Sequence, residues 1–256
     1  LAKLNATIVM VCRNKDSGEK VKEEIINLTG NNNIDLLVCD LSSLEQIRKL
    51  VTKFKEKYQN LHVLINNAGI MLKKRAVSVD GFEMNFVIHF LAPFLLTNLL
   101  LDILKKSAPS RIINVTSAAH KRAKIDFDDL QSENKKYRLF SVYGASKLAE
   151  VLFTYELSRK LEGTGVTANA LHPGVVNTNL GRDQSKFSQW FAKKFFKSPE
   201  EGAQTSIYLA SSPEVEDITG KYFVNRQPKE SSEESYNEEY AEQVWKIAVE
   251  MTKLNA

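Results

Sequence analysis

Tyr143 and Lys147 stand four residues apart at the head of an amphipathic stretch that extends to about Leu161. Residues four apart on a helix lie on the same face, so this spacing would place a phenol beside an ammonium group. A nearby ammonium favours the phenolate form, and such a phenol could exchange a proton with an alcohol or a carbonyl. The same spacing also fits an ordinary helix, in which the tyrosine packs and the lysine is solvated. The choice depends on the elements that surround the pair.

Short apolar runs alternate with helical patterns along the chain. The expected strands are 7–11, 34–38, 61–65, 111–115, 166–171 and 221–224. The expected helices are 16–28, 44–58, 81–106, 143–161, 199–210 and 233–254. This alternation predicts an α/β fold, namely a Rossmann-like doubly wound parallel sheet with helices on both faces. No repeat or linker divides the sequence, so we predict a single domain over residues 1–256.

Polar or small residues follow the carboxyl ends of these strands. In a doubly wound sheet, ligands bind outside those ends, along one rim. Ser117 follows the fourth expected strand, and the helix of Tyr143 begins after it. We therefore expect Ser117, Tyr143 and Lys147 to converge. The serine hydroxyl could donate a hydrogen bond to a carbonyl oxygen while the tyrosine passes it a proton.

At this point the sequence resembles the short-chain dehydrogenase/reductase family. The matching pieces are Asn66-Asn67-Ala68-Gly69, Ser117 after an apolar strand, the Tyr143 and Lys147 pair, and Pro173-Gly174 followed by Thr178. They stand in the family's order, and the resemblance covers essentially the whole chain. Four further segments resemble the retinol dehydrogenase branch, namely 80–84, 124–130, 171–176 and 199–205.

The resemblance implies an oxidoreductase that moves a hydride between a nicotinamide cofactor and a substrate. Tyr143 would be the catalytic acid and base, Lys147 would activate it and hold the nicotinamide ribose, and Ser117 would orient the substrate oxygen. The other residues implied at the cofactor are Asp40 and Leu41 near the adenine, Asn67, Ala68 and Gly69 on the adenosine side, and Pro173, Gly174, Val176 and Thr178 beside the nicotinamide. The implied substrate is an apolar alcohol or aldehyde, such as a retinoid or a lipid aldehyde.

The sequence departs from the family pattern at its beginning. A first strand and a glycine-rich turn, which would receive the pyrophosphate at a helix N-terminus, do not precede residue 7. We therefore expect the first central strand to be missing between 7–11 and 61–65, and the domain to be incomplete at its N-terminus. Unpaired backbone groups should then leave the chain alone inactive and only marginally folded. The alternative to an enzyme is a non-catalytic remnant or fragment of one.

A second departure is His89, at a position where the family usually places an asparagine that supports a water in its proton relay. A histidine could carry protons in its place. The simpler interpretation is an imidazole that only packs.

Arg13 follows the strand 7–11, which corresponds to the family's second strand. That strand usually ends in an acidic residue when the cofactor has a free ribose 2′-hydroxyl, whereas an arginine suits a 2′-phosphate. No carboxylate occurs here before Asp16, and a guanidinium binds phosphate well. We predict that the cofactor is NADP(H), with Arg13 on its phosphate.

Composition narrows the range of partners. The formal net charge is +4, but the charges are interleaved and form no basic stripe, so nucleic acid is not expected. Cys12 and Cys39 lack ligand spacing, which indicates a reducing intracellular compartment and no metal site. The apolar stretch 86–104 is interrupted by polar residues, so we expect a cytoplasmic protein or one attached to an organelle membrane through a segment upstream of residue 1. A homo-oligomer is compatible with these features.

Overall fold

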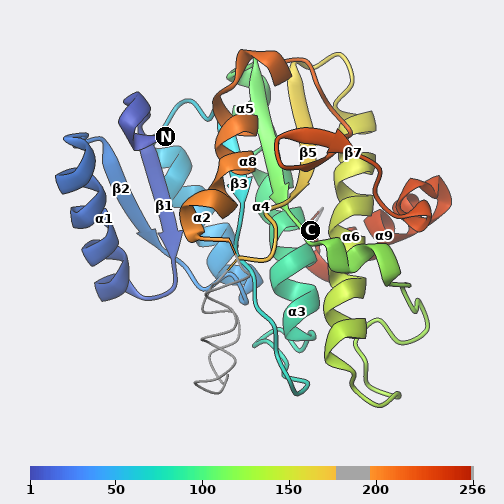
Figure 1. Ribbon diagram of the computed structural model, residues 1–256. Coiled ribbons are helices and arrows are strands. Elements are labelled where there is room, and N and C mark those ends of the chain that lie inside the picture. Colours follow the sequence, from blue (N-terminus) through green and yellow to red (C-terminus); the bar gives the residue numbers. More distant parts are fainter. Residues whose placement is uncertain (177–196, 255–256) are drawn as a thin grey trace.

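The computed structural model describes residues 1–176 and 197–254 as a parallel sheet in two parts, covered by helices (Figure 1). The strands are β1 (Ile8–Cys12), β2 (Ile34–Val38), β3 (Val63–Asn66), β4 (Ser110–Val115), β5 (Val166–His172), β6 (Tyr222–Val224) and β7 (Gln227–Lys229). All neighbours pair in parallel except β6 and β7, which are antiparallel. The predicted doubly wound α/β architecture is confirmed.

The sheet is interrupted between β1 and β3. β1 and β2 form a two-stranded sheet, and the order in the other sheet is β3-β4-β5-β6-β7. Over the described ranges, no strand pairs with the second edge of β1 or with the edge of β3 opposite β4. This is the position at which the sequence predicted that a central strand is missing. Direct pairing of β1 with β3 does not occur.

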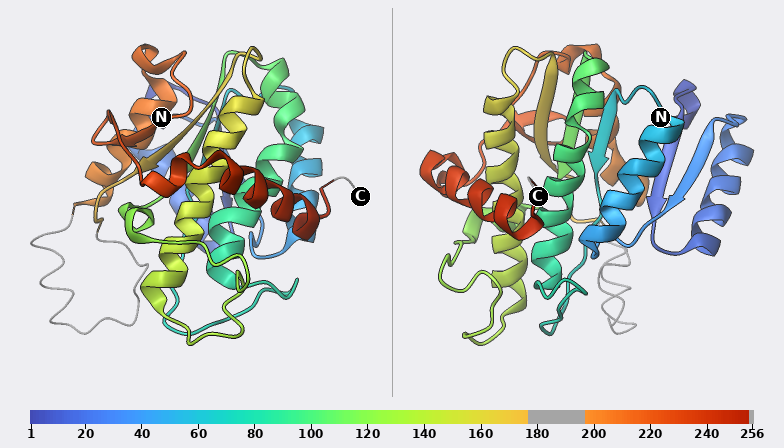
Figure 2. Two further views of the ribbon diagram at one scale, coloured as in Figure 1. Left: turned by 90° about the vertical axis from the view of Figure 1, so that its right-hand side faces the viewer. Right: turned by 180° about the vertical axis from the view of Figure 1, so that it is seen from behind.

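Helices cover both faces of the sheet. The α-helices are α1 (Lys15–Thr29), α2 (Leu44–Lys57), α3 (Met84–Phe86), α4 (Ala92–Leu99), α5 (Leu101–Lys106), α6 (Leu139–Lys160), α8 (Pro199–Ser211) and α9 (Glu238–Thr252). The shorter helical segments are η1 (Ala2–Leu4), η2 (Val87–Leu91), η3 (Ala118–Arg122), η5 (Pro213–Val215) and η6 (Glu233–Tyr236). Figure 2 shows α2, α4 and α6 side by side on one face, with α9 outside α6 and α8 on the opposite face.

The alternation of side chains along β4 explains the two layers of the core. Ile112 belongs to a large buried cluster with residues of α2, α4, α6 and α9, whereas Ile113 belongs to a second cluster with Leu209 of α8. Successive residues of a strand point to opposite faces, so one strand supplies both clusters. Phe94 and Phe153, with ring centroids 5.4 Å apart, fix α4 against α6 in the larger cluster.

The helix expected over 81–106 is divided into several pieces, and this prediction was wrong in detail. Gly81 adopts φ +84° in a turn, and Glu83 caps the first helical residues by accepting a hydrogen bond from the N–H of Phe86 at 2.8 Å. Val87–Leu91 then forms a π-helical turn. Pro93 lies just beyond it and has no N–H to offer to the carbonyl of His89 four residues earlier, which favours the wider turn.

Two features near the C-terminus were not expected from the sequence. β7 continues the sheet after a two-residue hairpin in which Asn225 and Arg226 have φ values of 52° and 64°. Such turns usually carry Asn-Gly, so the arginine hid the signal. The terminal helix begins at Glu238 because Asn237 accepts a hydrogen bond from the N–H of Tyr240 and caps it.

Within 1–176 and 197–254, none of the helices combines the length and the apolar character that crossing a bilayer requires.

Candidate active site

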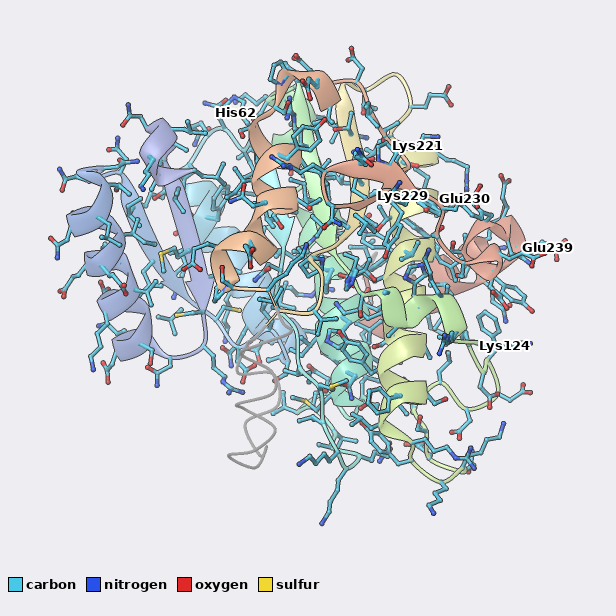
Figure 3. The ribbon with its side chains drawn as sticks, viewed as in Figure 1. His62, Lys124, Lys221, Lys229, Glu230 and Glu239 are labelled. Atoms are coloured by element: carbon cyan, nitrogen blue, oxygen red, sulfur yellow. The ribbon has the colours of Figure 1, made fainter. Side chains whose placement is uncertain are left out.

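The segments that follow the strands meet along one rim of the sheet. The arrowheads of β1 and β4 point toward the lower edge of Figure 1, where the connections to the following helices lie. His62 immediately precedes β3 and lies at the opposite end of the sheet (Figure 3). His62 is therefore remote from the rim, whereas the residues after β1, β3, β4 and β5 share it.

The end of β4 is attached to the first turns of α6. Thr116 Oγ1 donates a hydrogen bond to the backbone carbonyl of Lys147 at 3.1 Å, and Lys147 Nζ donates one to the carbonyl of Val115 at 2.8 Å. A Cβ added to Gly144 would lie 3.1 Å from the carbonyl oxygen of Ala119. Glycine therefore permits the segment after β4 to lie directly against α6.

Ser117 begins this segment and caps η3. Its Oγ accepts a hydrogen bond from the N–H of Ala119 at 3.2 Å. The backbone carbonyl of Ser117 accepts from His120 Nδ1 at 2.6 Å, which fixes the residue in place. The hydroxyl proton of Ser117 is not used in any hydrogen bond between described residues. It is therefore available to a substrate oxygen.

Tyr143 is held by its ring and not by its hydroxyl. The ring lies edge-on to the imidazole of His89, with centroids 5.2 Å apart and an interplanar angle of 88°. Its side chain is half-buried, and the phenol makes no hydrogen bond to any described residue. A fixed ring with an unoccupied hydroxyl is what a proton-exchanging phenol requires.

Lys147 makes a buried ion pair that the sequence analysis missed. Its ammonium lies 2.9 Å from Glu150 Oε2, and the two side chains are 4% and 1% exposed. Burial raises the pKa of the Glu150 carboxyl to about 7, although the Lys147 ammonium acts in the opposite direction. The available signal was their spacing of three residues on a helix, which is too common to stand out.

His89 is buried and held by a hydrogen bond on each side of its ring. It is fully buried, its Nε2 accepts from the N–H of Ile70 at 3.0 Å, and its Nδ1 lies 2.8 Å from Ser146 Oγ. Burial, assisted by the charge of Lys147, lowers the pKa of His89 well below its usual value, so the ring is neutral. With Nε2 as an acceptor, the ring proton belongs on Nδ1.

A chain of buried polar side chains joins the strands to α6. Asn66 Nδ2 donates to Asn114 Oδ1 at 2.8 Å, and Asn114 Nδ2 donates to Thr154 Oγ1 at 2.9 Å. Thr154 Oγ1 in turn donates to the backbone carbonyl of Glu150 at 2.7 Å. Satisfied buried networks of this kind specify a single arrangement of the elements that they link. This network was not predicted either.

The predicted cofactor residues that follow β1, β2 and β3 differ in their surroundings. Asn67, Ala68 and Gly69 are exposed directly after β3. Arg13 is exposed after β1, and its guanidinium has no partner in the described ranges. Asp40 differs, because its carboxylate accepts hydrogen bonds from the N–H and the hydroxyl of Ser42, at 3.0 and 2.8 Å.

Asp40 and Leu41 thus have evident structural roles. The Asp40 carboxylate closes the turn that leads into α2, and the half-buried side chain of Leu41 packs against the cluster formed by α2 and α4. If Asp40 or Leu41 contacts an adenine, the contact must be made by atoms that these interactions leave exposed.

Pro173, Gly174 and Val176 follow β5 on the same rim. Gly174 has φ +94°, and an added Cβ would lie 2.7 Å from the side chain of Lys197. Val176 forms a parallel β-bridge with Lys197, and its side chain contacts Gly202 of α8. Thr178 lies outside the described residues.

A cavity of about 420 Å³ lies beside α6. Val142, Ala145 and Ser146 line it, together with residues of the segment 124–138. None of Ser117, Tyr143 and Lys147 contributes to its wall, so we do not assign the reaction to this cavity.

Comparison with known proteins gives consistent matches. The model of the short chain dehydrogenase family matches residues 1–189. Human retinol dehydrogenase 13 is 45% identical over 264 residues, which cover 100% of this chain and 80% of that protein. Human polyprenol dehydrogenase is 44% identical over 266 residues, covering 98% of this chain and 79% of that protein. A solved structure of a putative uncharacterized protein from Mycobacterium paratuberculosis superposes with a TM-score of 0.77 at 29% identity, covering 98% of this chain and 88% of that one.

Proposed function

This chain belongs to the short-chain dehydrogenase family and resembles its retinol dehydrogenases, and from this premise we propose that it transfers a hydride between NADP(H) and an apolar alcohol or carbonyl compound. The observation that carries the proposal is the phenol of Tyr143. Its ring is fixed against His89, its hydroxyl is unoccupied among the described residues, and the segment of Ser117 lies against the same helix turn.

The proposed chemistry assigns one task to each side chain. In the direction of reduction, the hydroxyl of Ser117 donates a hydrogen bond to the substrate carbonyl, and Tyr143 gives its proton to the same oxygen. In the direction of oxidation, Tyr143 receives that proton from the alcohol. The nicotinamide supplies or accepts the hydride when it is bound. Lys147, Asn67, Ala68 and Gly69 would hold the cofactor along the rim.

The proposed preference for NADP(H) rests on Arg13. This guanidinium is exposed after β1 and unpaired within the described ranges, next to the capped N-terminus of α1. A phosphate in that position would meet both a guanidinium and the positive end of a helix. The carboxylate of Asp40 accepts both hydrogen bonds from Ser42 through Oδ1, and no ion pair joins it to Arg13 in the described ranges.

The proposed substrate class rests on the relatives. The names of the human proteins at 45% and 44% identity refer to a retinol and to a polyprenol, both apolar alcohols. We accordingly propose a long, apolar alcohol or the corresponding aldehyde as substrate. We also propose that the protein works in a reducing compartment, because Cys12 and Cys39 are both free thiols. The alternative, a non-catalytic remnant, is disfavoured because Ser117, Tyr143 and Lys147 are all retained.

Substitution of Tyr143 by phenylalanine in the whole protein tests the proposal. Turnover of retinal with NADPH should fall by about 10²–10⁴-fold, since the general acid is lost. The dissociation constant for NADPH should remain unchanged. Tyr155→Phe is a matched control, because its phenol lies on the same helix but bonds to Ser231 Oγ, at 2.8 Å, outside the proposed site. Turnover by Tyr143→Phe equal to that of the Tyr155→Phe control would contradict the assignment.

A further inference from the structure

We infer that Glu150 is a positioning residue for the proposed reaction, because it holds the ammonium of Lys147 from the inner side of α6 and leaves one N–H for the rim. This inference rests on the proposed function, in which Lys147 holds the cofactor next to Tyr143. Glu150 touches no reacting atom in this scheme and acts only through the lysine.

The geometry around the ammonium supports this role. Lys147 Nζ donates to Glu150 Oε2 at 2.9 Å and to the carbonyl of Val115 at 2.8 Å. An ammonium has three N–H groups, so one of them remains without an acceptor among the described residues. A buried N–H without a partner is unfavourable. The site is therefore prepared for a further polar acceptor, such as a ribose hydroxyl of the cofactor.

Glu150 is itself held through its backbone and through its side chain. Its backbone carbonyl accepts from Thr154 Oγ1 at 2.7 Å, which continues the buried network from Asn66 and Asn114. The hydroxyl of Thr116, at the end of β4, interacts with its carboxylate and favours the ionised form. The contacts of the carboxylate with Thr116 and with the Lys147 ammonium join the end of β4 to the lysine.

The ionisation of Glu150 should control this arrangement near neutral pH. Burial raises the pKa of its carboxyl to about 7, against the effects of Lys147 and Thr116. The titratable groups near the ammonium include the phenol of Tyr143, one turn earlier on α6, and His89, from η2, which burial and Lys147 keep neutral. When Glu150 takes up a proton, the ammonium loses its only carboxylate partner in the described chain. We therefore expect kcat/KM to decline on the acid side as Glu150 becomes protonated.

A second buried glutamate on the same helix provides a matched control. Glu156 pairs with Arg159 at 2.6 Å and with Lys160 at 2.9 Å, six residues farther along α6. Its partners are half-exposed and lie outside the proposed site. Glu156→Gln therefore removes a helix ion pair of similar type without touching Lys147.

The test compares Glu150→Gln with Glu156→Gln in the whole protein. The measurements are thermal unfolding, the NADPH dissociation constant, kcat, KM and the pH profile of kcat/KM. Glu150→Gln should lower kcat/KM at pH 8 by about 10–100-fold, as expected for a displaced catalytic group. It should also abolish the decline of kcat/KM near pH 7, because the ionising group is gone. Glu156→Gln should keep the parent profile.

Either of two results with Glu150→Gln would overturn the inference. In the first, the folded Glu150→Gln variant keeps the decline of kcat/KM on the acid side (the acid limb) that the parent shows. In the second, the kcat/KM of this variant at pH 8 lies within twofold of the parent value. Should that variant fail to fold, Glu150→Asp retains the charge on a shorter side chain. It should lower kcat/KM while keeping an acid limb, and a parent-like kcat/KM for it would equally refute the role. If Tyr143→Phe is inactive and Glu150→Gln is normal, only this inference fails; if Tyr143→Phe is active, the proposed function fails.

Discussion

Nε2 of His89 accepts a hydrogen bond from the backbone N–H of Ile70 at 3.0 Å. This contact ties the exposed segment after β3 to the π-helical turn. On its other side, Nδ1 of His89 lies 2.8 Å from Ser146 Oγ, which donates to the carbonyl of Tyr143 at 2.8 Å. His89 therefore connects the proposed adenosine side of the rim to the first turn of α6.

Replacement of His89 by asparagine should reduce stability. The shorter side chain cannot reach both partners, and a buried N–H left unpaired at Ile70 costs about 1–3 kcal/mol. Urea unfolding of the His89→Asn variant would measure the loss in the free energy of unfolding. The His62→Ala variant, changed at an exposed histidine, is the control. Because His89 is neutral, the acid limb of kcat/KM should persist in His89→Asn. Loss of that limb would instead identify His89 as a proton carrier.

Replacement of Arg13 by alanine should weaken NADPH binding and leave NADH binding unchanged. A hydrogen bond between charged groups contributes about 1.5–3 kcal/mol, so the dissociation constant for NADPH should rise roughly 10–100-fold. Titration calorimetry with both cofactors would measure the change, and Lys20→Ala on the exposed face of α1 is the control. Equal affinities of the parent protein for the two cofactors would argue against this role of Arg13.

Replacement of Gly144 by alanine should impair turnover. The new methyl group would lie 3.1 Å from the carbonyl oxygen of Ala119 and 3.0 Å from Cβ of Ala123, so η3 and α6 must move apart. Overpacking of this kind costs about 1–3 kcal/mol, and it shifts Ser117 relative to Tyr143. Ser141→Ala, an exposed change on the same helix, is the control. If Gly144→Ala matches Ser141→Ala in both melting temperature and kcat, close contact at this point is not required.

Acid should destabilise the protein as the pH falls below about 6.5, because burial lowers the pKa values of His89, His120 and His172 from a usual value of 6.5. The unfolded chain then binds more protons than the folded one, so stability rises with pH through this window. For His172, whose pKa is lowered to about 4, the window extends from 6.5 down to 4. The contribution of Glu150 to the pH dependence of stability has the opposite sign. Its pKa is raised, so the folded state binds a proton more readily than the unfolded chain between pH 4.5 and pH 7.

His172→Gln should make the melting temperature less dependent on pH. Its Nδ1 is buried without a partner among the described residues, so little bonding is lost. The histidine contributes about 1–2 kcal/mol of acid destabilisation at pH 5, allowing for its partial exposure. Thermal scans from pH 8 to pH 5 on parent and variant would reveal the difference. Parallel curves would mean that His172 is not the group responsible.

The order of most strands and helices along the chain and the i, i+4 spacing of Tyr143 and Lys147 on one helix were determined by the sequence itself. These features depend on local backbone preferences and on periodicity, which a single chain displays directly. The polar ends of the strands likewise predicted the rim, because parallel strands bring their carboxyl ends to one edge. The interruption of the sheet between β1 and β3 was predicted from the resemblance to the family, whose first strand would lie there.

Only the tertiary structure decided what the polar side chains contact. Lys147 bonds to Glu150 and to the carbonyl of Val115, and Asp40 bonds to Ser42. His89 meets Ile70 and Ser146, which are 19 and 57 residues away in the sequence. Such contacts depend on which groups become buried together, and burial sets the strength of each interaction and the charge of each group. The strength of an interaction and the charge of a group cannot be read from the neighbouring residues in the sequence. The partners of Lys147 and His89 were therefore identified only in the folded structure.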